Sequence, residues 1–365
     1  MNKKLFIHVG PPKTGTSVIQ FWLNTHSQWL KNQGVYYPQH ELDSNSVSSG
    51  HRALFLERLS QTTRTRFNHA KFQQLLTEFN ETDCSSLLLS SEFFFYQIPE
   101  FLKYKDQYDI QLIAYVRADL ELIESLYNQS VKRNGQTMPL PHRNQLPKSY
   151  LDELIDFVSI YSDRTFSLRA YGDSTVFNTD IITDLLSCLD LEPPTGYGPQ
   201  SEKINSSYSF ECLEFKRWVN KFCLGDLDHR IDQCLQGFKS NTRAYSLLPA
   251  NTYQCYQEQS LKKIKALQTL APIENYESLI NYVKAKSRAS YIHQELYPEH
   301  LVKVGEYLLA TDKSLLSELV NHIGSKKLAN SDVEYFDLLQ QLLVTNKMPE
   351  QKKSWLSKLM RKMGK

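Results

Sequence analysis

The residues best suited to chemistry lie in a short turn near the start of the chain. An apolar stretch at residues 4–9 is followed by Gly10-Pro11-Pro12-Lys13-Thr14-Gly15-Thr16-Ser17, and a helical pattern then covers residues 16–31. In a strand–turn–helix unit, converging backbone N–H groups, the positive helix end and Lys or Ser/Thr side chains bind phosphate-like anions. Lys13 precedes Gly15, which differs from the Walker A order, where the lysine follows the second glycine. The plainer interpretation is an ordinary tight turn.

A second candidate anion site lies at the end of a later strand. Residues 110–116 form an apolar stretch that ends at Arg117, and Ser125 follows in a helix expected over residues 119–134. A guanidinium can donate two parallel hydrogen bonds to a phosphate, and a serine hydroxyl in the first helical turns can add a third. The alternative for Arg117 is a surface ion pair with Asp119 or Glu121.

Together these patterns resemble a known enzyme family. Residues 12–17 resemble the 5′-phosphosulfate loop of sulfotransferases that use 3′-phosphoadenosine 5′-phosphosulfate (PAPS), and Arg117 with Ser125 resembles their 3′-phosphate site. The resemblance covers residues 4–225 and is nearest to bacterial members that act on saccharide-like or lipid acceptors. It implies PAPS as co-substrate, no required metal, and transfer to a hydroxyl or amine. It assigns to PAPS the residues Pro12, Lys13, Thr14, Gly15, Thr16, Ser17, Arg117, Ser125 and, near the adenine, Tyr171.

Sulfuryl transfer also needs a cation beside the leaving phosphate oxygen and a base for the acceptor's proton. Lys13 suits the first role. For the base the sequence offers Glu92, directly after the apolar stretch 86–91, and His51, in a polar stretch that enters a helix. The resemblance to glycan-modifying sulfotransferases favours Glu92. Glu92 could instead cap a helix or form a salt bridge, and His51 could be an exposed loop residue.

Two other functions compete with this interpretation. A P-loop kinase or NTPase would use Glu92 to hold magnesium, although Lys13 then lies on the wrong side of Gly15. A non-catalytic nucleotide- or glycan-binding module is the third possibility. Nucleotide preference separates the first two, because a kinase should prefer Mg-ATP whereas a sulfotransferase should bind adenosine 3′,5′-bisphosphate without magnesium.

The elements that must position these residues follow an α/β pattern. Apolar stretches alternate with helical patterns, which is typical of a parallel sheet. The strands are expected at residues 4–9, 86–91, 110–116 and 165–171, and the helices at 16–31, 52–60, 67–80, 119–134, 149–162 and 178–189. We therefore predict an α/β fold with a central parallel sheet, a phosphosulfate-binding loop after the first strand and flanking helices.

The pattern changes after a stretch rich in proline, glycine and serine at residues 192–208. From Phe210 to about residue 345 the sequence shows mostly amphipathic helices and no convincing strand, which predicts a mainly helical C-terminal region. The expected organisation is a PAPS-binding domain over residues 1–225, a helical cap or subdomain over 226–350 and a basic tail over 351–365.

Composition limits the partners and the location. Lysine plus arginine (42) nearly balance aspartate plus glutamate (40), so no overall basic field favours nucleic acid. The six cysteines show no CxxC pair or metal-ligand spacing, which argues against a zinc site. The N-terminal apolar stretch is too short for a signal peptide, which favours a cytoplasmic location. The tail, residues 351–365, has six basic residues and no acid, and at helical spacing its apolar side chains share one face. This predicts contact with a membrane surface, with a solvated C-terminus as the alternative.

Overall fold

The computed structural model describes residues 3–40, 49–58, 65–161, 165–177, 180–198, 208–240 and 244–345. The chain forms two compact units. The first takes residues 1–122, 143–204 and 253–287, and the second takes residues 123–142, 205–252 and 288–365. None of the described helices has both the length and the apolar character that a membrane crossing needs. The tail at 351–365 lies outside the described residues, so its predicted membrane contact stays a prediction.

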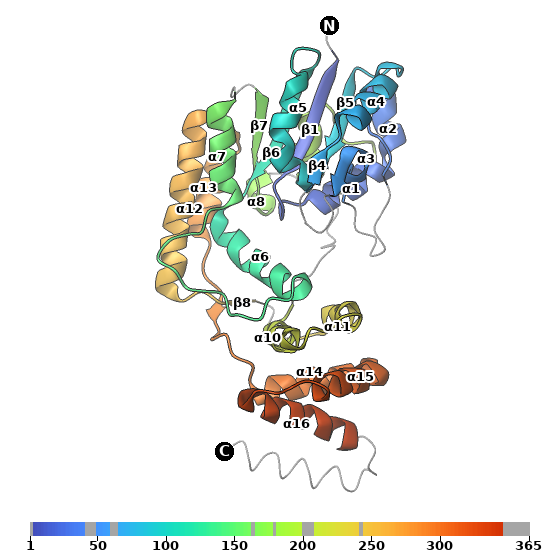
Figure 1. The fold of residues 1–365 in the computed structure, drawn as a ribbon. Coiled ribbons are helices and arrows are strands. Elements are labelled where there is room, and N and C mark those ends of the chain that lie inside the picture. Colours follow the sequence, from blue (N-terminus) through green and yellow to red (C-terminus); the bar gives the residue numbers. More distant parts are fainter. Residues whose placement is uncertain are drawn as a thin grey trace. The chain divides into compact units, whose positions relative to one another are not determined.

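A six-stranded parallel sheet forms the centre of the first unit (Figure 1). Its strand order is β2-β5-β1-β6-β7-β9. The bounds are β1 (Lys4–Gly10), β2 (Val35–Tyr36), β5 (Ser86–Ser90), β6 (Asp109–Val116), β7 (Phe166–Ala170) and β9 (Ile273–Glu274). Because all six strands run in the same direction, the segments that follow β1, β5, β6 and β7 meet at one edge, where open α/β sheets bind ligands.

Apolar layers cover both faces of this sheet. Along β1 the side chains alternate, so that Leu5, Ile7 and Val9 join one layer and Phe6 joins the other. The Leu5 layer includes side chains from α4 (His69–Asn80), α5 (Ile98–Phe101), α7 (Tyr150–Ile160), α12 (Ala250–Leu270) and α13 (Tyr276–Ala285). The Phe6 layer includes side chains from α1 (Thr16–Thr25), α2 (Ser27–Asn32) and α9 (Ile181–Ser187). The strands are therefore buried on both sides, as their continuous apolar sequences indicate.

Shorter elements complete the first unit. They are α3 (Arg52–Phe55), the antiparallel pair β3 (Leu56–Arg58) and β4 (Thr65–Phe67), the 3₁₀-helices η1 (Glu92–Gln97) and η2 (Leu102–Tyr104), and α8 (Ser174–Phe177). Helix α6 (Asp119–Arg133) begins in the first unit, and the division between the units falls within it, after Leu122.

The second unit is mainly helical. It contains α10 (Phe210–Val219), η4 (Asn220–Phe222), α11 (Leu227–Gln236), α14 (Pro298–Thr311), α15 (Lys313–Gly324) and α16 (Asn330–Thr345), with the two-residue strands β8 (Tyr245–Ser246) and β10 (Ser290–Tyr291). One of its buried charges shows how such a group is accommodated: the fully buried Lys216 ammonium donates to Asp228 at 2.7 Å and to Asn220 at 2.5 Å. Such internal pairing is what burial of a charge requires.

The predicted α/β fold with a central parallel sheet and a mainly helical C-terminal region is confirmed. Two local predictions are wrong. The helix expected over residues 52–60 ends at Phe55, because the next three residues pair with β4. The helix expected over residues 16–31 is interrupted at His26, which separates α1 from α2.

The region after Phe210 also differs from its prediction. Residues 273–274 form β9, which pairs with β7 at the edge of the sheet. Residues 253–287 consequently belong to the unit that holds the sheet, rather than to a separate helical cap over 226–350. A two-residue strand has no periodicity that a sequence could reveal, because an alternating pattern needs about four residues or more.

Candidate functional site

The turn after β1 has the backbone of a tight anion-binding loop. Gly10 and Gly15 have φ of 87° and 75°, and Lys13 adopts a φ of 68° between them. The Thr14 hydroxyl donates to the Pro11 carbonyl at 2.5 Å, so this buried side chain braces the turn. Helix α1 begins at Thr16, and its first N–H groups lack partners within the helix, so they are donors available to an anion. The buried Thr16 hydroxyl makes no hydrogen bond within the described part of the chain, which fits a ligand-facing role.

Gly15 is required by what lies against it. A Cβ atom at this position would approach the Ile181 Cδ1 to 2.5 Å and the Tyr171 Cε2 to 3.4 Å. Its positive φ adds a second reason for glycine. The ring of Tyr171 therefore packs directly on the turn, and its predicted contact with an adenine stays a prediction.

Arg117 also reaches this turn. Its Nη1 donates to the Lys13 carbonyl at 2.5 Å, and its guanidinium carbon lies 5.1 Å from the centre of the Tyr171 ring. Burial lowers the pKa of Arg117 below its usual value. The structure thus brings together the turn, Arg117 and Tyr171, three of the predicted donor-binding elements. Ser125 lies farther along α6, in the second unit, and its predicted role beside Arg117 stays a prediction.

The ion pair considered for Arg117 is present in a loose form. Its Nε lies 3.5 Å from a Glu121 carboxylate oxygen and makes no hydrogen bond within the described residues. Asp119, the other candidate partner, instead accepts from Lys263 and from Ser149, each at 2.8 Å. Arg117 is therefore held in place without a close ion pair.

Sequence reasoning missed a cation beside Arg117. Lys286 follows α13 and donates to the Glu121 carboxylate and, at 2.8 Å, to the Tyr282 hydroxyl, which itself donates to Glu121 at 2.8 Å. Burial and the nearby Arg117 charge lower the pKa of Lys286 to about 8. Two cations, Arg117 and Lys286, therefore share the single carboxylate of Glu121.

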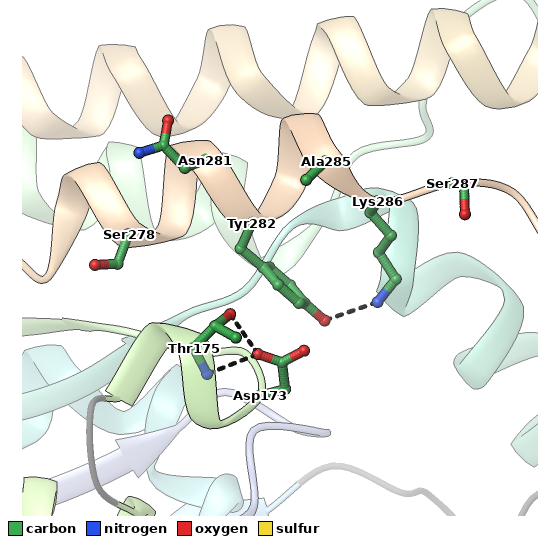
Figure 2. Close-up of a pocket in the computed structure, with 8 residues that line it drawn as sticks. All are labelled: Asp173, Thr175, Ser278, Asn281, Tyr282, Ala285, Lys286 and Ser287. Carbon is green, nitrogen blue, oxygen red and sulfur yellow. Dashed lines mark hydrogen bonds between the residues drawn. The ribbon is translucent and has the colours of Figure 1, made fainter.

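Lys286 and Tyr282 line a pocket of about 640 Å³ between α8 and α13 (Figure 2). Figure 2 shows the Tyr282 ring projecting from α13 toward Asp173, whose carboxylate accepts from the Thr175 amide at 2.9 Å and from its hydroxyl at 2.6 Å. The full lining is Asp173, Thr175, Ser278, Asn281, Tyr282, Ala285, Lys286 and Ser287. The lining combines a ring, a cation, one carboxylate and several neutral hydrogen-bonding groups, a set that can hold a nucleoside with its phosphate at the cation.

Glu92 lies next to the start of the turn, as predicted from its position after β5. It opens η1, and a Cβ atom on Gly10 would lie 3.4 Å from the Glu92 Cα and 3.6 Å from its Cβ. The adjacent Ser91 amide donates to the His8 carbonyl of β1 at 3.1 Å, which fixes this approach. The half-buried Glu92 carboxylate is thus placed at the same sheet edge as Lys13.

His51 is fully buried, so the alternative that it is an exposed loop residue is wrong. Its Nδ1 accepts from the Ser90 amide at 3.0 Å, so its Nε2 carries the proton and donates to the Pro38 carbonyl at 2.6 Å. Burial lowers the pKa of His51 to about 3. Gly50 allows this close packing, since a Cβ there would lie 2.0 Å from the Ser90 carbonyl oxygen. With its basic nitrogen occupied, His51 suits a structural role, and the geometry favours Glu92 as the base.

No family model, curated protein or solved structure matches this chain.

The site must therefore be judged by its own chemistry. It offers Lys13 in a turn at a helix N-terminus, a pair of cations in Arg117 and Lys286, and a carboxylate at Glu92. Among the described residues, no group of three or more His, Cys, Asp or Glu side chains is arranged to hold a metal ion. The arrangement can bind a ligand with two separate anionic groups and accept a proton beside one of them.

Proposed function

We propose that this chain is a sulfotransferase that moves the sulfuryl group of PAPS to a hydroxyl or amine of a saccharide- or lipid-like acceptor. The contact that carries the proposal joins the Arg117 guanidinium to the Lys13 carbonyl, across 104 residues of sequence. It unites the two segments that separately resemble the 5′-phosphosulfate and 3′-phosphate sites. A donor with phosphates on both sides of one ribose needs its two anion sites this close together.

The residues divide the donor between them. The turn and the start of α1 hold the 5′-phosphosulfate, and Arg117 with Lys286 holds the 3′-phosphate. The pocket lined by Tyr282 takes the nucleoside, and Tyr171 lies between the turn and Arg117. This assignment extends the PAPS-binding segment beyond residue 225, to residues that the sequence prediction placed in a helical cap.

The reaction is a direct displacement at sulfur. The acceptor oxygen or nitrogen forms a bond to sulfur while the bond from sulfur to the 5′-phosphate oxygen breaks. Adenosine 3′,5′-bisphosphate leaves with the electron pair, and the Lys13 ammonium stabilises the charge that develops on that oxygen. Glu92 takes the acceptor's proton. Positioning of donor and acceptor supplies much of the remaining acceleration.

The test combines a binding and a transfer measurement. The wild-type protein should bind adenosine 3′,5′-bisphosphate in calorimetry with EDTA present, and should transfer labelled sulfuryl from PAPS to members of a saccharide and lipid panel. Lys13→Ala should lower transfer by about 10²–10³-fold, because one preorganised charge-stabilising donor is lost. Lys31→Ala, at an exposed position of α2, is the matched control and should transfer like the wild type.

The competing functions predict other results. A P-loop kinase or NTPase would prefer Mg-ATP over adenosine 3′,5′-bisphosphate, and a binding module would bind without transfer. Near-wild-type transfer by Lys13→Ala would reject the assigned role of the turn. A cytoplasmic location and a membrane contact through residues 351–365 belong to the same proposal, but the chemistry does not depend on them.

A further inference from the structure

A tyrosine ring on the segment that Glu92 begins lies next to a second tyrosine ring on α7. Tyr96, on η1, is 55% exposed, which is unusual for so large a ring. Its centre lies 6.1 Å from that of Tyr150, the first residue of α7, and the two planes are inclined by 47°. Phe95 is fully buried beneath them and meets the Tyr150 ring edge-on at 5.5 Å. We call Tyr96 and Tyr150 the tyrosine platform; the buried Phe95 anchors it, so its rings are held in place before any ligand arrives.

The tyrosine platform is continuous with the candidate catalytic carboxylate. Glu92 and Tyr96 belong to the same 3₁₀-helix. Burial raises the pKa of the Tyr150 hydroxyl, and the Glu92 carboxylate raises it further, as a nearby negative charge does. On its other side Glu92 lies against Gly10, the first residue of the anion-binding turn. The order in space is therefore turn, carboxylate, platform, all within the first unit.

Polar groups border the rings. Glu153 lies one turn into α7 and is hydrogen-bonded to the Tyr96 hydroxyl. Burial raises the pKa of that hydroxyl, and the neighbouring Tyr150 and Glu153 raise it further. One Glu153 carboxylate oxygen is buried and makes no hydrogen bond within the described residues. The platform thus combines two ring faces with two phenol hydroxyls and two carboxylates. An alkyl chain would displace water from these polar groups without offering them a hydrogen bond, and an anionic ligand would be repelled by the carboxylates.

We propose that the tyrosine platform binds a neutral pyranose ring of a saccharide acceptor and presents one of its hydroxyls to Glu92. The C–H groups on one face of a pyranose form an apolar, slightly positive surface that complements the negative face of a tyrosine ring. The sugar hydroxyls at the ring edge meet the phenols and carboxylates. The inference rests on the proposed sulfotransferase function and narrows its acceptor from saccharide- or lipid-like to a neutral saccharide.

The experiment uses the full-length protein on an array of neutral, amino and acidic oligosaccharides, with and without adenosine 3′,5′-bisphosphate. Wild type should bind neutral members, and Tyr96→Ala should weaken that binding about tenfold or more, because stacking on an exposed ring is lost. Tyr96→Phe, which keeps the ring, should stay within about threefold of wild type. Tyr291→Ala, at a tyrosine of the second unit that is 37% exposed, is the matched control.

The experiment tests saccharide binding by the tyrosine platform independently of nucleotide binding at the donor site. The proposal is supported if Tyr96→Ala loses binding of neutral saccharides, Tyr96→Phe retains it, and the affinity for adenosine 3′,5′-bisphosphate is unchanged in both variants. Equal binding by Tyr96→Ala, a preference for acidic members, binding of alkyl chains instead, or no saccharide bound by wild type overturns it. If wild type binds a neutral saccharide through Tyr96 but no adenosine 3′,5′-bisphosphate, the proposed function fails and the platform remains as a saccharide site.

Discussion

Two half-buried arginines of the first unit are held in opposite ways. Arg169, on β7, donates to both carboxylate oxygens of Asp184, at 2.6 and 2.8 Å, and to the Ser187 hydroxyl at 2.9 Å. Arg117, just after the neighbouring strand β6, keeps its Nε 3.5 Å from Glu121. Burial lowers the pKa of both guanidinium groups, but at Arg169 the Asp184 hydrogen bonds outweigh it and the pKa rises, whereas at Arg117 the pKa falls.

We interpret the difference as that between a structural arginine and the ligand-binding arginine of the proposed function. A guanidinium has five N–H donors in a planar fork. A carboxylate in the same plane accepts two parallel hydrogen bonds from it, the same number that a phosphate would accept. Asp184 occupies the fork of Arg169 in this way. Arg117 is positioned by a backbone carbonyl and a ring face, and it shares the Glu121 carboxylate with Lys286, so its fork is less fully occupied than that of Arg169.

The strongest test of this contrast replaces each arginine by alanine. Arg169→Ala should lower the free energy of unfolding by about 3–5 kcal/mol, because it leaves the Asp184 carboxylate, whose side chain is 4% exposed, buried without its partner. Arg117→Ala should cost less stability. It should instead make the binding free energy of adenosine 3′,5′-bisphosphate less favourable by about 2–5 kcal/mol while that of AMP changes little, because only the bisphosphate has a 3′-phosphate. Urea unfolding and calorimetry measure the two effects.

Exchanged phenotypes would break the comparison. If Arg169→Ala unfolds like the wild type, its ion pair is not structural. If Arg117→Ala weakens both nucleotides equally, Arg117 does not hold the 3′-phosphate.

A pH series sharpens the same comparison through Lys286. In the ligand-free protein its pKa is about 8, so Lys286 is charged below this pH and loses its proton above it. Above pH 8, binding of the 3′-phosphate must first restore the proton, and affinity for adenosine 3′,5′-bisphosphate should fall by up to about tenfold per pH unit. Calorimetry between pH 7 and 9.5 should show this fall, and Lys286→Met should abolish it. A flat profile for the wild type would place Lys286 outside the site.

The smallest effect concerns Glu121, which Arg117 and Lys286 share. An incoming phosphate must replace this carboxylate as their counter-ion, so Glu121→Gln should tighten adenosine 3′,5′-bisphosphate about three- to tenfold at pH 6.5. Removing the carboxylate also disfavours the charged form of Lys286, so the midpoint of the pH series should move to lower pH. Weaker binding at pH 6.5 would show that Glu121 supports the site rather than competing for it.

Sequence reasoning succeeded where the signal was local. The turn from Gly10 to Ser17 is recognisable in the sequence because glycines and a lysine stand between an apolar strand and a helix. The structure gives Gly10 and Gly15 the positive φ angles that glycine allows. Glu92 was singled out because ligand sites gather where parallel strands end, and Arg117 because a serine follows it at the spacing of a 3′-phosphate site. The structure places both residues next to the turn.

The same reasoning failed where a contact depends on distant packing. Lys286 donates to Glu121, which lies 165 residues earlier in the chain. The segment that contains Lys286 returns to the sheet by way of β9, a two-residue strand with no periodic pattern. His51 stands in a polar stretch that reads as a surface loop. Its burial follows from hydrogen bonds to Ser90 and Pro38 that no local sequence feature announces.

The late return of the chain to the sheet has a consequence during biosynthesis. A ribosome releases β1, β5, β6 and β7 long before it reaches β9, so the growing polypeptide exposes the outer edge of β7 until residue 274 emerges. Tyr282 and Lys286 follow later still. A nascent chain of 225 residues would contain the whole anion-binding turn and yet lack half of the cations proposed for the 3′-phosphate. On the proposed assignment, nucleotide capture would become possible only after residue 286 emerges, and expression fragments cut at residue 225 would stop short of it.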